Sequence, residues 1–164
     1  MNGLPMMKTL LTDQQNPIKV LLAEDDEDDQ FFFSNVLSEL PFATELTIVN
    51  NGEAAVEKLK CPESQPDIIF LDLNMPKMSG KECLKMIKTN NLYKTIPCVI
   101  LSTSSSGAEI EETYCAGANL YLLKPNEVSN LLKMVDTVLK IDWKEYITPK
   151  RELYFLSERS LQRA

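Results

Sequence analysis

Four short apolar runs of strand length are each followed at once by polar side chains of complementary chemistry. In chain order these polar groups are two adjacent carboxylates, a third carboxylate, a hydroxyl and an amine: Glu24 and Asp25, Asp72, Ser102, and Lys124. Mg²⁺ prefers oxygen ligands, and proteins usually hold it with one or two carboxylates together with phosphate oxygens. A carboxylate can also attack phosphorus as a nucleophile, and an amine and a hydroxyl can bind the phosphoryl oxygens. The set can therefore hold a divalent cation and a phosphoryl group on Asp72.

The apolar runs alternate with segments of helical periodicity. Strands are expected near residues 18–23, 44–50, 67–72, 97–101 and 119–123. Apolar residues recur at i, i+3, i+4 and i+7 from Phe33 to Leu40, which indicates an amphipathic helix. Further helices are expected after Gly52, over about 80–90 and 107–116, and along the stripe that begins at Val128. Five β–α units in succession predict an α/β fold, a doubly wound five-stranded parallel sheet with strand order 2-1-3-4-5, as in flavodoxin-like proteins.

This strand order brings the acidic residues together. Strands 1 and 3 are neighbours in it, and the carboxyl ends of parallel strands meet at one edge of the sheet, where such folds place their sites. Glu24 and Asp25 should therefore share a crevice with Asp72, although they are distant in sequence. The peptide oxygen of Asn74 is a further candidate ligand for the Mg²⁺.

Composition excludes several classes of function. The chain of 164 residues has a net charge of −7, which argues against nucleic acid as a partner because phosphate binding needs clustered Lys and Arg. Its longest apolar stretches are about six residues, far below the roughly 20 that span a bilayer, and its start lacks the pattern of a secretory signal. A cytoplasmic protein without a membrane partner is therefore expected. The predicted organisation is an N-terminal arm at 1–16, one domain at 17–141 and a C-terminal extension at 142–164.

The chain contains no histidine, which excludes Ser-His-Asp and Cys-His catalysis and zinc sites that need imidazole. A protein without histidine also cannot donate a phosphoryl group from phosphohistidine. The four cysteines form no CxxC pair and are interpreted as structural thiols.

Each motif also has an ordinary structural explanation. The acidic run 25–29 could be a solvated helix start, Lys124-Pro125 a strand exit, and Ser102 to Ser106 a polar loop. An aspartate that ends a strand also occurs in nucleotide hydrolases, but no GxxxxGK[ST] loop precedes it here. All the groups occur together, each at a strand end, and this favours a phosphoryl acceptor.

With these motifs, residues 17–141 resemble the receiver domains of two-component response regulators, in particular CheY-like stand-alone receivers. The matching motifs are Glu24-Asp25, Asp72 with Met75-Pro76, Ser102, Gly117-Ala118 and Lys124-Pro125. The resemblance implies that Asp72 accepts a phosphoryl group from a sensor histidine kinase or a phosphotransfer protein. It also implies a Mg²⁺ bound directly by Asp25 and mainly through water by Glu24. The long acidic first helix resembles receivers that are paired with phytochrome-type kinases.

The resemblance also implies a switch. Ser102 would be the hydroxyl that moves toward the phosphoryl group, and Tyr121 the aromatic side chain whose rotamer follows it. The family more often has Thr at the first of these positions and a small residue at the next, where Thr103 stands. Both hydroxyls are therefore candidate phosphoryl contacts, and Ser102 ranks first because its spacing from Pro97 is typical of the family.

The leading hypothesis is a single-domain response regulator, which is not an enzyme and signals by protein contacts. One alternative is an aspartate-nucleophile phosphohydrolase, but such enzymes usually carry a second acid two residues after the nucleophile, where Asn74 stands. Another is a degenerate receiver that binds partners without phosphorylation. The fold would also permit a flavin-binding module, for which no residue argues.

The C-terminal extension is unusually rich in aromatic residues for a disordered tail. They are Trp143, Tyr146, Tyr154 and Phe155. The extension could pack back on its own domain or dock on another protein. We expect docking on a kinase or on another subunit, with a homodimer as one possibility.

Overall fold

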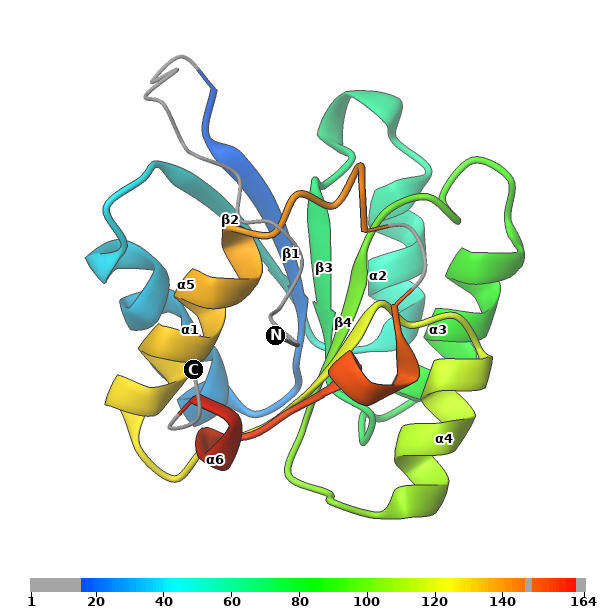
Figure 1. Cartoon of the computed structure of the whole chain (residues 1–164). Coiled ribbons are helices and arrows are strands. Elements are labelled where there is room, and N and C mark those ends of the chain that lie inside the picture. The colour runs from blue at the N-terminus through cyan, green and yellow to red at the C-terminus, as the bar shows by residue number, and fades with distance from the viewer. Residues whose placement is uncertain (1–15, 147–148, 162–164) are drawn as a thin grey trace.

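The fold is built on a parallel β-sheet with helices on both faces (Figure 1). A computed structural model describes residues 16–146 and 149–161. The sheet contains six parallel strands in the order β2-β1-β3-β4-β5-β6. In chain order the strands are β1 (Ile18–Ala23), β2 (Thr44–Val49), β3 (Ile68–Leu71), β4 (Cys98–Ser102), β5 (Leu120–Leu123) and β6 (Phe155–Leu156). The predicted fold class and the order of the first five strands are confirmed.

Helices α1 and α5 cover one face of the sheet, and α2, α3 and α4 cover the other (Figure 1). The helices are α1 (Glu27–Glu39), α2 (Gly52–Leu59), α3 (Gly80–Thr89), α4 (Gly107–Cys115), α5 (Val128–Leu139) and α6 (Glu158–Leu161). Two short 3-10 turns, η1 (Pro62–Ser64) and η2 (Arg151–Leu153), complete the described elements.

The central strands are apolar throughout because both of their faces are buried. Side chains of β1 alternate between two cores: Val20 and Leu22 pack with α1 and α5, whereas Leu21 and Ala23 pack with α2 and α3. All four residues of β3 are buried in the same way. This burial fixes the register of the strands and therefore the position of the residues that follow them.

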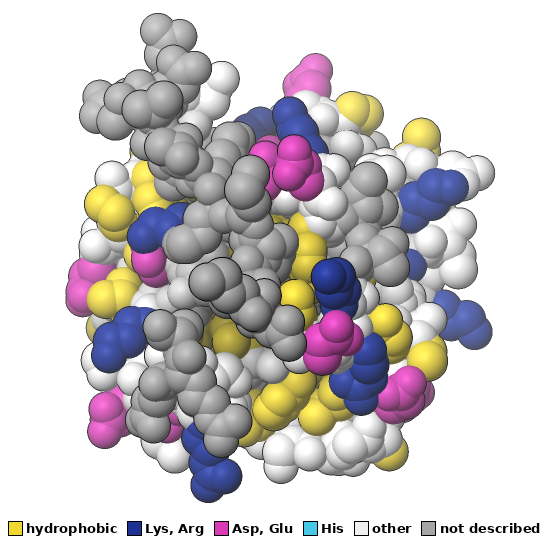
Figure 2. Space-filling view, viewed as in Figure 1, with side chains coloured by type: hydrophobic (Ala, Val, Ile, Leu, Met, Phe, Trp, Pro, Cys, Tyr) yellow, Lys and Arg dark blue, Asp and Glu magenta, His cyan; other side chains and the backbone are white. Residues whose placement is uncertain are grey.

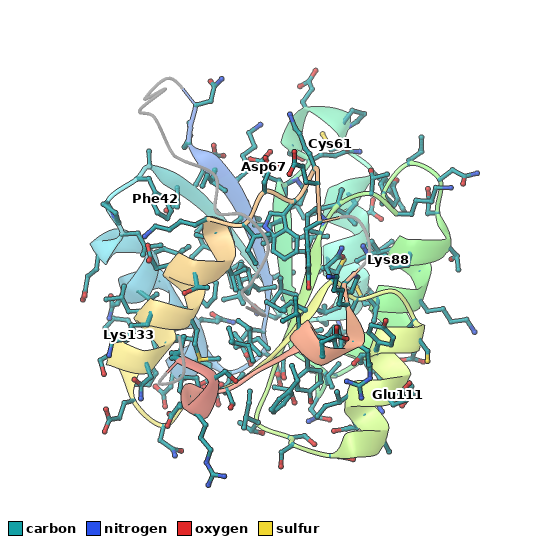
Figure 3. All side chains as sticks on the ribbon, viewed as in Figure 1. Phe42, Cys61, Asp67, Lys88, Glu111 and Lys133 are labelled. Carbon is teal, nitrogen blue, oxygen red and sulfur yellow. The ribbon has the colours of Figure 1, made fainter. Side chains whose placement is uncertain are left out.

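A half-buried lysine, Lys88, ties α3 to the amino-terminal ends of β4 and β5, at the opposite edge of the sheet from the acidic residues. The side chain of Lys88 reaches from α3 toward the sheet (Figure 3) and donates hydrogen bonds to the carbonyl of Ile96 (2.8 Å) and to Oδ1 of Asn119 (2.9 Å). Burial lowers the pKa of Lys88, because the charged ammonium loses hydration. We assign this lysine a structural role.

The C-terminal extension differs from expectation. Strand β6 pairs in parallel with β5, so that Tyr121 lies opposite Phe155 and Leu122 opposite Leu156. The expected docking on another protein is therefore wrong for this structure, and the five-stranded sheet gains a sixth strand. The physical reason is that β5 would otherwise present unpaired backbone groups at the sheet edge, and the aromatic residues of the extension have an apolar surface beside it.

The surface carries charges of both signs, and two of the four cysteines are buried. Basic and acidic side chains are interspersed on the face drawn in Figure 2. Within residues 16–146 and 149–161, no helix is both long and apolar enough to cross a bilayer. Cys61 and Cys115 are exposed, whereas Cys83 and Cys98 are buried. Burial raises the pKa of the Cys83 thiol to about 12 and that of Cys98 to about 11, which fits structural thiols.

Candidate functional site

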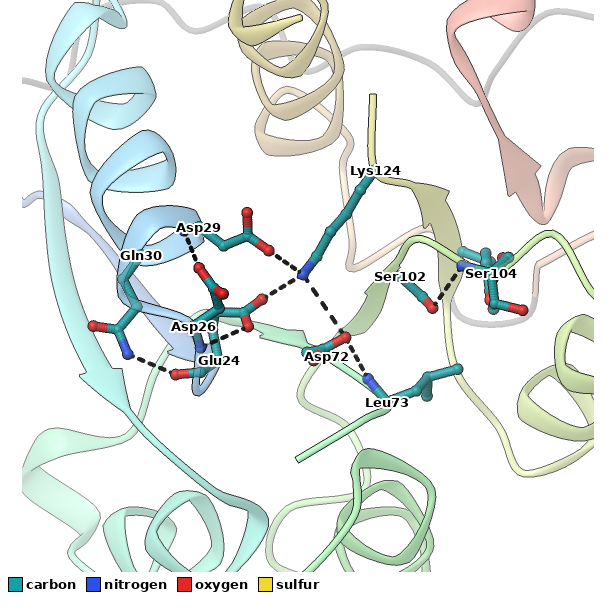
Figure 4. Close-up of polar contacts among 10 residues, drawn as sticks. Glu24, Asp26, Asp29, Gln30, Asp72, Leu73, Ser102, Ser104 and Lys124 are labelled. Carbon is teal, nitrogen blue, oxygen red and sulfur yellow. Dashed lines mark hydrogen bonds and ion pairs between the residues drawn. The ribbon is translucent and has the colours of Figure 1, made fainter. Parts of the chain in front are cut away.

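Three carboxylates meet at the carboxyl ends of β1 and β3. Ligand oxygens of Glu24, Asp25 and Asp72 all lie within 4.8 Å of one another, and Figure 4 shows Glu24 and Asp72. Parallel pairing of β1 with β3 causes this, since Ala23 lies opposite Leu71 and the N–H of Asp72 donates to the carbonyl of Ala23 at 3.0 Å. The sequence-based expectation that these residues share one crevice therefore agrees with their placement.

Burial gives two of these carboxylates an unusual environment. Glu24 is 1% exposed and Asp72 is 7% exposed, whereas Asp25 is exposed. Desolvation raises the pKa of both Glu24 and Asp72, because burial disfavours the charged form, and the nearby ammonium of Lys124 opposes this shift. Backbone N–H groups of Leu73 and Asn74 also oppose the shift at Asp72, and the first donates to Oδ1 at 2.9 Å.

The amine of Lys124 lies within the acidic cluster. Its Nζ donates to Oε2 of Glu24 at 2.6 Å and to Oδ2 of Asp29 at 2.7 Å, and it lies 3.9 Å from Oδ1 of Asp72 (Figure 4). Burial alone would lower the pKa of Lys124, but the bonds to Asp29 and Glu24 and the charge of Asp72 outweigh burial and raise it. The lysine therefore stays protonated and partly neutralises the cluster.

Sequence reasoning missed Asp29, which it assigned only to the acidic start of a helix. The side chain of Asp26 caps α1 by accepting the N–H of Asp29, and this cap orients the first turn toward the site. Asp25 precedes the N-cap Asp26 and lies outside α1, so helical spacing does not relate it to Asp29. The signal that the sequence offered was the acidic run itself, which places a carboxylate in the first turn of a helix that begins next to the strand end.

The two candidate hydroxyls have different environments. Ser102 ends β4, is fully buried, and its Oγ accepts the N–H of Ser104 at 3.2 Å (Figure 4). Thr103 is exposed. The N–H of Lys124 donates to the carbonyl of Ser102 at 2.7 Å, which ties the ends of β4 and β5 together. This placement favours Ser102 over Thr103 as the hydroxyl directed at Asp72.

Asn74 and Tyr121 differ in their exposure to solvent. Asn74 is exposed in the turn that follows Asp72. Tyr121 is fully buried within β5, and its hydroxyl donates to the carbonyl of Ser104 at 2.8 Å. Ser104 therefore contacts both Ser102 and Tyr121, and it connects the two residues that the resemblance assigns to a switch.

The donor set fits a divalent cation. A group of three carboxylates with two members buried concentrates negative charge that water does not fully screen, and hard cations prefer such oxygen ligands. Lys124 compensates part of this charge, and Asp25 is open to solvent.

Comparison with known proteins agrees with this geometry. The sequence model of one protein family, the response regulator receiver domain, matches residues 20–136. The chain belongs to this family. It is 36% identical over 144 residues to response regulator Rcp1 of Synechocystis sp., an alignment that covers 84% of this chain and 97% of the relative.

Solved structures of receivers match as well. The phosphorylated cyanobacterial phytochrome response regulator RcpA superposes with a TM-score of 0.70 at 33% identity, covering 75% of this chain and 91% of that one. The Mn²⁺-bound form of Rcp1 gives a TM-score of 0.69 at 35% identity, covering 82% and 99% of the two chains. The fold and the receiver family are thus shown by sequence and by structure, and receiver domains bind Mg²⁺ or Mn²⁺ in an acidic pocket.

Proposed function

We propose that this receiver is a single-domain response regulator that accepts a phosphoryl group on Asp72 in a Mg²⁺-dependent reaction and signals by protein contacts. The observation that carries the proposal is the meeting of Glu24, Asp25 and Asp72 with Lys124 at the carboxyl ends of three strands. A buried nucleophile, a group of carboxylates that can hold a cation, and a nearby ammonium are the parts that phosphoryl transfer requires.

The reaction balances without an acid from this chain. An Oδ atom of Asp72 attacks the phosphorus of the donor, the new O–P bond forms as the P–N bond to the donor's imidazole breaks, and that nitrogen keeps the electron pair. Asp25 and Asp72, with Glu24 through water and the peptide oxygen of Asn74, would hold the Mg²⁺, which neutralises charge on the phosphoryl oxygens.

Lys124 and Ser102 would bind the phosphoryl group once it is on Asp72. Lys124 lies 3.9 Å from Asp72 and can pair with a phosphoryl oxygen once its bond to Glu24 is weakened. The buried Ser102 hydroxyl accepts one hydrogen bond and still has its own proton to donate. Movement of Ser102 would act on Tyr121 through Ser104, so the aromatic side chain is the proposed reporter of phosphorylation.

The proposed donor is a sensor histidine kinase or a phosphotransfer protein, because a chain without histidine needs another molecule as donor. A structural relative, RcpA, is a phytochrome response regulator. This relationship supports a phytochrome-type kinase as the first donor to test.

Intact-mass measurement after incubation with acetyl phosphate and Mg²⁺ tests the proposal. Wild type should gain the mass of one phosphoryl group, and Asp72→Asn should gain none. Asp67→Asn is the matched control, since Asp67 stands at the other end of the same strand and accepts the N–H of Lys19 at 2.8 Å. It should be labelled like wild type. Equal labelling of Asp72→Asn and wild type would contradict the acceptor assignment.

Two further experiments test the need for Mg²⁺ and the identity of the phosphoryl donor. Chelation of divalent cations should abolish labelling, and Asp25→Asn should need more Mg²⁺ for the same rate. A phosphorylated phytochrome-type kinase should transfer its label to wild type. Complete resistance of wild type to every phosphoryl donor would instead indicate a receiver that works without phosphorylation.

A further inference from the structure

The C-terminal segment, residues 149–161, lies along the edge of β5 that faces away from β4, and it packs against α4 (Figure 1). The N–H of Tyr121 donates to the carbonyl of Tyr154 at 2.8 Å, and the next two residues of the segment form β6. Tyr154 is fully buried and Leu156 is 5% exposed, so the segment fills a shaped site. This pairing is the arrangement by which an extended peptide adds a strand to a sheet.

Helix α4 provides a pocket for the tyrosine of the segment. The hydroxyl of Tyr154 donates to Oγ1 of Thr113 at 2.9 Å, and Thr113 is itself 1% exposed. The ring of Tyr114 packs edge-on against the ring of Tyr154 with centroids 5.0 Å apart. A buried hydroxyl at the end of an aromatic pocket selects Tyr over Phe, because Phe would leave Thr113 without this partner.

Charge and backbone groups add recognition on both sides of the tyrosine. Arg151 pairs with Glu111 of α4 at 2.8 Å, and its guanidinium lies 5.4 Å from the centre of the Tyr114 ring. Figure 3 shows Glu111 on α4, close to η2 of the segment. At the other end, Oε1 of Glu158 accepts the N–H of Asn126 at 2.8 Å. The site thus contacts a basic residue in η2, the tyrosine that follows this turn and, after the two-residue strand β6, an acid at the start of α6.

The occupied site also includes the buried Tyr121. Its ring contacts those of Tyr154 and Phe155, with centroids 6.3 and 5.9 Å away. Whatever fills the site therefore sets the surroundings of Tyr121, the side chain that connects through Ser104 to Ser102.

We propose that the edge of β5 and the adjoining side of α4 form a peptide-binding site, and that the C-terminal segment is its built-in, displaceable ligand. A protein partner that binds this face would present a segment that makes one tight turn and then pairs in parallel with β5, with a basic residue three positions before a tyrosine and an aromatic residue after it. The segment is suited to displacement because β6 contains only two residues and lies at the sheet edge. This site does not depend on phosphorylation of Asp72.

The test uses the full-length chain and a labelled synthetic peptide of residues 149–161. A tethered ligand competes at millimolar effective concentration, so wild type should bind the peptide weakly. Tyr154→Ala weakens the tethered copy and should bind the peptide at least tenfold more tightly than wild type. Arg151→Ala should give a smaller gain of the same sign, and Arg159→Ala, an exposed arginine of the same segment, should behave as wild type.

The peptide itself supplies the check on specificity. A peptide carrying Tyr154→Phe should bind the Tyr154→Ala chain about fivefold more weakly, because the bond to Thr113 is lost. If Tyr154→Ala unfolds, Arg151→Ala carries the test, since this side chain is exposed and its loss should leave the core intact. Equal peptide affinity in wild type, Arg151→Ala and Tyr154→Ala, or equal affinity for both peptides, would overturn the proposal.

Discussion

Replacement of Gly80 by alanine should damage the site although no charged residue is replaced. Gly80 opens α3, and a Cβ built on it would lie 2.0 Å from the carbonyl oxygen of Asp72 and 2.8 Å from the Cα of Leu73. The N–H of Gly80 donates to the carbonyl of Leu73 at 3.0 Å, so the turn between β3 and α3 closes tightly on Asp72. An added methyl group must push the backbone of Asp72 away.

The size of the effect follows from this contact. Relief of a 2.0 Å contact needs a shift of about 1 Å, since carbon and oxygen atoms rarely approach within about 3 Å. Overpacking costs about 1–3 kcal/mol, and a clash with backbone belongs at the upper end of that range. The free energy of unfolding should therefore fall by about 3 kcal/mol. A 1 Å misplacement of a reacting group can cost roughly 100-fold in rate, so labelling of Asp72 should slow by about that factor.

Gly107→Ala is the matched control. Gly107 also follows a serine N-cap and opens a helix, α4, but a Cβ there would meet no heavy atom within 4 Å. Alanine has a higher helix propensity than glycine, so the free energy of unfolding of this variant should equal that of wild type or exceed it by up to about 1 kcal/mol. Urea unfolding and the rate of labelling by acetyl phosphate with Mg²⁺ measure both effects. Wild-type stability and labelling rate in Gly80→Ala would refute the reasoning.

Two substitutions test the electrostatics of the site, and a thiol reagent tests the burial of the cysteines. Asp29→Asn should lower the pKa of Lys124 in an NMR titration, because pairing with Asp29 raises it; an unchanged pKa would remove Asp29 from the site. Burial raises the folded-state pKa of Asp72 above its unfolded value, so the stability contributed by its protonated form is lost as pH rises through the raised pKa. Asp72→Asn should therefore unfold at higher urea than wild type at pH 7, and the difference should vanish near about pH 3, where both states bind the proton. In the folded protein, a thiol reagent should modify the exposed Cys61 and Cys115 quickly and the two buried cysteines only after unfolding.

The parts of the site that follow from strand order were predictable from the sequence. Near-continuous apolar runs such as Ile68 to Leu71 indicate strands buried on both faces, and their alternation with helical segments dictates a parallel sheet. Once β1 and β3 are neighbours, Glu24 and Asp72 must meet, because strand ends are rigid positions. Expectation and structure agree there because backbone topology alone decides the outcome.

The parts that depend on side-chain choices were not predictable. Lys124 could extend to any of several carboxylates, and its pairing with Asp29 depends on how α1 leaves its cap. Strand β6 was missed for a different reason: two residues are too few for an alternating pattern to appear. Its position is decided by the edge of β5 and by the pocket around Thr113, which no local sequence signal describes.

The pairing of Lys124 implies an order of events at the proposed phosphorylation site. Glu24 accepts a 2.6 Å bond from the lysine and is also a proposed partner of the cation, so one carboxylate serves two positive groups. A carboxylate that shares its charge with a divalent ion attracts an ammonium less strongly. The amine would then be held by Asp29 and drawn toward Asp72, 3.9 Å away, where phosphorylation adds negative charge. Cation binding should therefore precede and assist the movement of Lys124 toward the phosphoryl group.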